Sequence, residues 1–121
     1  MANKPSVSAL AQRIAGQIEK ILSTPISEKS KALLLRTVAA AQRTAGQLIE
    51  LSDSASDLHS TKICNSASDI NVHLANVAGR IRTYEDGDDI LLDDGPEMEN
   101  YAKMIRRAYS KEAKLERARR S

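Results

Sequence analysis

The side chains that could bind a metal through nitrogen or sulfur are His59, Cys64 and His73. A zinc site on a helix favours ligands four residues apart, because that spacing puts them on one face. Here the intervals are five and nine residues, so no such pair forms. We therefore expect no metal site. We expect Cys64 to be a small buried residue and both histidines to lie at the surface or its boundary.

Acidic residues concentrate in one segment: eight of the sixteen Asp and Glu residues lie between Glu85 and Glu99. A calcium-binding EF-hand loop requires an oxygen ligand at its fifth position. Counted from Asp86, that position is Ile90, which has none. The sequence also lacks a phosphate-binding glycine loop, a nucleophile elbow and a cysteine pair. We expect no calcium site, no cofactor and no enzymatic activity.

Within the acidic segment, the stretch DDILLDD places three consecutive apolar residues between pairs of aspartates. The loop could fold back and bury these residues over one end of the protein, as apolar loop residues often do. Alternatively, it is an exposed docking segment whose leucines fill a partner's groove while the carboxylates meet a basic rim. The predicted partner-binding residues are Asp88, Asp89, Ile90, Leu91, Leu92, Asp93 and Asp94.

The C-terminal part of the chain is basic, because eight Lys and Arg residues follow Tyr101 against two Glu, a net charge of +6. Such a surface could neutralise nucleic-acid phosphates or an acidic membrane surface. It could also be a solvated helix face that pairs with the acidic loop of its own chain or of a neighbour. The predicted basic face comprises Lys103, Arg106, Arg107, Lys111, Lys114 and Arg117.

Apolar residues recur every three or four positions, which predicts helices at about residues 7–22, 26–52, 61–83 and 96–117. Ser6 or Ser8 could cap the first of them. We expect residues 84–95 to form the acidic loop and residues 116–121 to be a frayed basic tail. The predicted fold is all-α: a single domain over residues 1–121, built as an antiparallel, up-and-down four-helix bundle with a short first helix and a basic C-terminal helix.

A short motif, Ala-Gly followed by a polar residue and Ile or Leu, occurs three times, with its glycines at Gly16, Gly46 and Gly79. Glycine inside a helix costs up to about 1 kcal/mol relative to alanine, so we expect these glycines to allow close packing. Each copy lies in one helix, which argues against a solenoid. In a simple hairpin the first two copies would lie roughly 18 Å apart along the axis and would not face each other.

The stretch LLRTVAAAQRTAGQLIELS resembles a vinculin-binding helix of the alanine-rich bundles of talin, vinculin and α-catenin. The resemblance rests on the spacing of Leu34, Val38, Ala41, Ala45, Leu48 and Ile49. It covers one helix, and Gln42 stands where such helices usually carry a small apolar residue. It implies a cytoskeletal bundle adaptor as one alternative function.

The amino-acid composition limits the kinds of core, cellular location and function that we expect. There is no Phe or Trp, so small aliphatic side chains must form the core, which favours closely packed helices over a wide ligand cavity. One cysteine, no signal-like segment and no membrane-length apolar run suggest the cytoplasm or nucleus. We expect a protein–protein interaction module, such as an adaptor, assembly or regulatory subunit, which also self-associates. Nucleic-acid binding by the basic C-terminal helix is the main alternative.

Overall fold

The computed structural model describes residues 6–55 and 57–110. These ranges contain four α-helices, namely α1 (Val7–Ser23), α2 (Lys31–Glu50), α3 (Leu58–Arg82) and α4 (Asp94–Ala108), and no strand. A short 3-10 turn, η1 (Ser52–Ser54), follows α2. The helices pack against one another as a bundle, which confirms the predicted all-α class.

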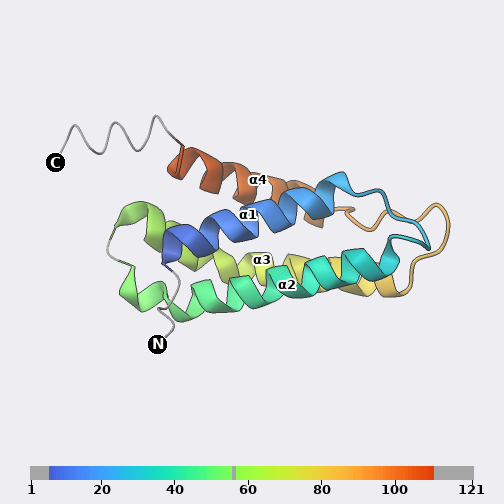
Figure 1. The fold of residues 1–121 in the computed structure, drawn as a ribbon, viewed down its shortest axis with the longest axis horizontal. Coiled ribbons are helices and arrows are strands. Elements are labelled where there is room, and N and C mark those ends of the chain that lie inside the picture. The colour runs from blue at the N-terminus through green and yellow to red at the C-terminus, as the bar shows by residue number, and fades with distance from the viewer. Residues whose placement is uncertain (1–5, 56, 111–121) are drawn as a thin grey trace.

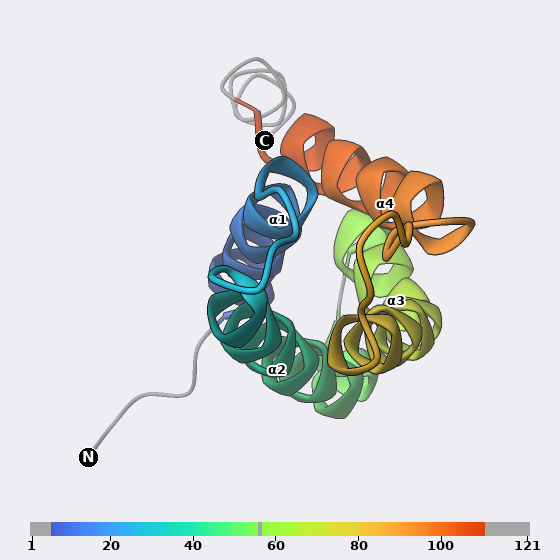
Figure 2. The ribbon, with the colours of Figure 1, turned by 90° about the vertical axis from the view of Figure 1, so that its right-hand side faces the viewer.

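The helices are arranged in a ring, with α1 and α3 on one diagonal and each packed against both α2 and α4 (Figure 2). In Figure 1 the chain passes along the molecule and returns with each successive helix. Contacts between α3 and α4 show the same alternation of direction. Asp94 contacts Arg80 near the end of α3, whereas the Tyr101 hydroxyl donates to the Ile63 carbonyl near its start (2.8 Å). The two helices therefore run in opposite directions.

Local hydrogen bonds decide where the helices begin. The Ser6 hydroxyl accepts from the Ala9 amide (3.1 Å), which confirms Ser6 as the cap of α1. Residues 26–30 were expected to be helical, but Ser27 and Ser30 each accept from the other's backbone amide. This reciprocal turn delays α2 until Lys31. In contrast, α3 begins at Leu58, earlier than expected, because the Asp57 carboxylate accepts from the Ser60 amide (2.8 Å).

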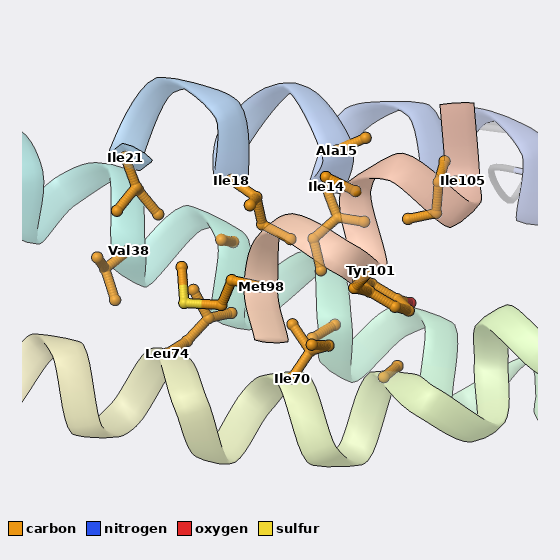
Figure 3. Packing of buried hydrophobic residues seen from close by; sticks show 14 of the residues in the cluster. Ile14, Ala15, Ile18, Ile21, Val38, Ile70, Leu74, Met98, Tyr101 and Ile105 are labelled. Atoms are coloured by element: carbon orange, nitrogen blue, oxygen red, sulfur yellow. The ribbon is translucent and has the colours of Figure 1, made fainter. Parts of the chain in front are cut away.

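The core is aliphatic and receives side chains from all four helices (Figure 3). Its largest fully buried members include Ile14, Ile18, Leu74, Met98 and Ile105. Cys64 is also buried, as predicted, and burial raises the pKa of its thiol. Tyr101 is the aromatic residue among the buried members of this cluster, and burial raises the pKa of its phenol.

The repeated motif does not serve close packing at two of its three sites. A Cβ added at Gly46 or Gly79 would meet no atom within 4 Å, and at Gly16 it would make an ordinary 3.8 Å contact with Arg106. The close-packing prediction is therefore wrong for Gly46 and Gly79. These glycines lie at half-buried positions with open space beside them.

The first two copies line one surface hollow, contrary to the expectation that they would not face each other. This hollow is lined by Gln17 of the first copy and by Gly46 and Gln47 of the second, together with Arg13 and Arg43, which precede the two copies in the sequence. Two physical reasons explain the difference. The late start of α2 shortens the offset between the copies along the helix axis, and the long Arg and Gln side chains span what remains.

Within the described residues, no helix combines the length and the apolar character needed to cross a membrane.

Candidate interaction surface

The acidic loop between α3 and α4 folds onto the bundle. The Ile90 side chain is 4% exposed and belongs to the core, and Leu91 is half-buried against it. Leu92 points outward and is 54% exposed. The Asp89 carboxylate accepts from the backbone amides of Leu91 and Leu92, both at 3.0 Å, and so holds this turn. The three apolar residues thus divide between core and surface, which favours the folded-back interpretation.

Asp94, the last of the predicted loop residues, lies in the first turn of α4 and is 4% exposed. One carboxylate oxygen lies 2.6 Å from His73 Nδ1 and accepts from Asn76 Nδ2 at 3.1 Å. The other oxygen accepts from the Arg80 guanidinium. Burial alone would raise the pKa of Asp94, but these three hydrogen bonds outweigh burial and hold the pKa below its ordinary value.

This Asp94 cluster was not predicted from the sequence. Its signal was the spacing of His73, Asn76 and Arg80, which are three and four residues apart and therefore share one face of α3. The consequence concerns the predicted docking segment. Ile90 and Asp94 are held in the bundle, so a partner cannot reach these two side chains unless the loop moves.

The other predicted loop residues remain at the surface. Asp88 accepts from the Glu85 amide (2.8 Å) across a turn that contains Gly87 at φ +94°. Asp93 is exposed and makes no capping hydrogen bond to α4. Leu92 has a positive φ of 23°, a conformation that side-chain-bearing residues adopt rarely.

The predicted basic face divides over two sides of α4. Arg106 turns toward α1, where its guanidinium donates to Glu19 at 2.6 Å and 3.2 Å, and this bond lowers the pKa of the Glu19 carboxyl. Lys103 pairs with Glu99 at 2.7 Å, and Arg107 is exposed. Within Asp94–Ala108 three basic residues balance three acidic ones, so α4 itself is not basic. Lys111, Lys114 and Arg117 lie outside the described residues.

A groove runs between α3 and α4 on the outside of the bundle. One hollow of about 370 Å³ has Ser66, Asp69 and Glu97 in its walls and buried Ile70 and Tyr101 beneath. An adjoining hollow contains basic side chains from both helices; these are His59, Lys62, Lys103 and Arg107. Asn100 and Met104 line both hollows, which therefore form one continuous groove, called here the α3/α4 groove. Its two ends carry opposite charge.

The outer stripe of α3 borders this groove. It consists of Leu58, Lys62, Asn65, Asp69 and Val72, which are all exposed and lie alternately four and three residues apart. Leu58 (80%) and Val72 (60%) are the most exposed large apolar side chains of the described residues. The spacing of these positions by three or four residues is visible in the sequence. The predicted helix begins only at residue 61, however, so the prediction does not include Leu58 in the stripe.

Among the residues that the structure describes, no group of three or more His, Cys, Asp or Glu side chains is placed to hold a metal ion. Comparisons of this chain with protein-family models, with curated proteins and with solved structures find no match. The functional argument therefore rests on the residues of the chain itself.

Proposed function

We propose that this protein is a non-enzymatic interaction module, an adaptor, assembly or regulatory subunit, that binds another protein chain in the α3/α4 groove. One observation carries the proposal: Leu58 and Val72, the two most exposed large apolar side chains of the described residues, lie on one stripe beside a groove with an apolar floor. Single exposed apolar residues are common on protein surfaces. Two on one stripe, with a groove beside them, match the way an amphipathic helix is bound.

The charges support the same proposal. Asp69 and Glu97 mark one end of the groove, and Lys62 and Arg107 mark the other. Opposite charges at the ends of a binding groove favour one orientation of the bound chain and disfavour the reverse. In this proposal the acidic loop plays a smaller part than its sequence predicts, and contributes through exposed Leu92 and the neighbouring surface aspartates.

A pull-down from the native lysate, read by mass spectrometry, tests the proposal. The test variant carries Leu58→Ser and Val72→Ser. The matched control carries Leu33→Ser and Ile49→Ser, because these residues are the exposed large apolar side chains of α2. We expect the wild type and the control to retain the same partner and the groove variant to lose it. If both variants retain that partner, the groove is not its binding site.

Nucleic-acid binding is the second candidate, and one feature favours it. The hollow that contains His59, Lys62, Lys103 and Arg107 has no acidic residue in its lining. Phosphate binding by this hollow would weaken steeply as salt rises. The double variant Lys62→Gln and Arg107→Gln should then reduce both the affinity for single-stranded or duplex DNA and its salt dependence. Absence of binding excludes the candidate, and binding that is unchanged in this variant excludes this hollow as the nucleic-acid site.

The cellular location and the talin-like alternative are also parts of the proposal, and both rest on the sequence. A location in the cytoplasm or nucleus fits the lone buried thiol of Cys64. The talin-like alternative stays a prediction: α2 buries Leu34, Val38, Ala41, Ala45 and Leu48 of its six resembling residues. A vinculin-type partner would therefore reach this stripe only after α2 leaves the bundle.

A further inference from the structure

We propose that the partner at the α3/α4 groove is a second copy of this protein, which docks through its own α3/α4 face and is related to the first by a two-fold axis that crosses α3 near Asn65. This inference rests on the proposed interaction function and names its partner. In a two-fold interface the same surface serves both subunits, so each residue must suit the residue at its mirrored position. The outer stripe of α3 satisfies that condition.

The stripe is self-complementary about its centre. Leu58 and Val72 lie seven residues before and after Asn65, so the axis brings the exposed apolar side chain of each copy onto that of the other. Lys62 lies three residues before Asn65, and Asp69 lies four residues after it. The axis therefore also pairs Lys62 of each copy with Asp69 of the other copy. One two-fold arrangement therefore pairs the apolar residues of the stripe with each other and its basic residue with its acidic residue.

The same axis must also cross α4, whose charges agree with it in polarity. Glu97 lies with Asp69 at one end of the groove, and Lys103 and Arg107 lie with Lys62 at the other. An axis across both helices therefore sets the acidic end of each copy on the basic end of the other. The charges of α4 thus favour the same arrangement as those of α3.

The charges also select between two ways of docking the faces. A two-fold axis across the helices runs α3 antiparallel to α3 of the second copy and sets acidic ends on basic ends. An axis along the groove would instead set α3 of each copy on α4 of the other, with Asp69 against Glu97 and Lys62 against Arg107. Like charges in direct contact disfavour an interface, so the first arrangement is the one proposed.

Charge exchange between two residues tests this geometry. Lys62→Glu places a glutamate against Asp69 of the second copy, and Asp69→Lys places a lysine against Lys62. We expect each single variant to weaken self-association at least about tenfold, measured by analytical ultracentrifugation over a range of concentrations. The double variant, and an equimolar mixture of the two single variants, should associate again, because both restore opposite charges at every mirrored pair.

Arg36→Glu on α2 is the matched control, since it reverses an exposed charge away from the groove and should leave association unchanged. Circular dichroism on each variant shows that the bundle is folded. If the mixture and the double variant fail to associate, or if the wild type is monomeric at every concentration, the two-fold proposal is overturned. The interaction function has a separate readout: it survives if the monomeric protein still captures a partner that the Leu58/Val72 variant loses.

Discussion

Asp94 is the residue whose role differs most from its role in the sequence-based prediction. The sequence places it among surface carboxylates of a docking segment, but the structure buries it against His73, Asn76 and Arg80. A buried carboxylate is tolerated when hydrogen bonds and a cation compensate for lost hydration. Asp94 therefore fixes the start of α4 to α3, and the acidic loop between them is anchored at its C-terminal end.

We expect Asp94→Asn to lower the free energy of unfolding by about 1–3 kcal/mol, because it removes charge-assisted hydrogen bonds from a buried site. Arg80 is partly exposed and can regain water, which limits the loss. Urea unfolding followed by circular dichroism measures the effect. Asp93→Asn, a change at the neighbouring exposed carboxylate, should have little effect, and equal losses from both variants would contradict this role of Asp94.

The same residue gives a dependence of stability on pH. The folded-state pKa of Asp94 is depressed, so the unfolded state binds a proton more readily. Its contribution is fully present above the unfolded pKa, about 3.9, and is lost as pH falls through the lower folded value. The difference in unfolding free energy between wild type and Asp94→Asn should therefore shrink below about pH 4. If this difference in unfolding free energy increases as the pH falls, the pKa of Asp94 is not depressed in the folded state.

At the scale of elements, the helices were largely predictable and their ends were not. The three-to-four-residue period of Ile63, Ile70 and Leu74 indicates a buried stripe whatever the neighbouring helices are. Helix ends depend on short-range hydrogen bonds, and the Ser27–Ser30 turn competes with the first turn of α2. The α3/α4 groove needs two helices in register, a relation that no single-helix pattern contains.

The loop between α3 and α4 should tolerate one apolar substitution and not another. Ile90→Ser should lower the free energy of unfolding by about 2–3 kcal/mol, since it exchanges a buried aliphatic side chain for a hydroxyl. Leu92→Ser changes an exposed residue and should cost little. Thermal unfolding of the two variants checks this, and similar losses would show that both side chains contribute to the core. A triple Ile90/Leu91/Leu92→Ser change would therefore destabilise the fold, so a loss of binding in that variant would not identify the loop as a docking site.

The helix-interior glycines offer a test with the opposite sign. Gly46→Ala and Gly79→Ala should each raise the free energy of unfolding by up to about 1 kcal/mol, because alanine favours the helix and its methyl group meets no neighbour. Gly87→Ala is the contrasting variant, since φ +94° in the loop disfavours any side chain, and it should destabilise the protein. Chemical denaturation of the three variants measures these changes, and a loss at Gly46 or Gly79 would mean that another surface packs there.

For the whole molecule, the proposed two-fold assembly links stability to concentration. A partner that binds only the folded state stabilises it by mass action, so the wild-type Tm should rise with protein concentration. Lys62→Glu should remove this rise while leaving the Tm at low concentration close to that of wild type, because Lys62 is exposed. Scanning calorimetry at several concentrations provides the measurement. A Tm independent of concentration in wild type would contradict the assembly.

The ring of helices has a consequence for how the protein is made. Glu19 of α1 and Arg106 of α4 meet although 87 positions separate them in the chain, and α4 also covers core residues of α1. During synthesis α1, α2 and α3 emerge first, and the apolar side of α1 that faces α4 stays uncovered until Met98, Tyr101 and Ile105 have been added. Nascent chains halted before α4 should therefore be aggregation-prone and bind chaperones that recognise exposed apolar surface, whereas the finished chain should release them.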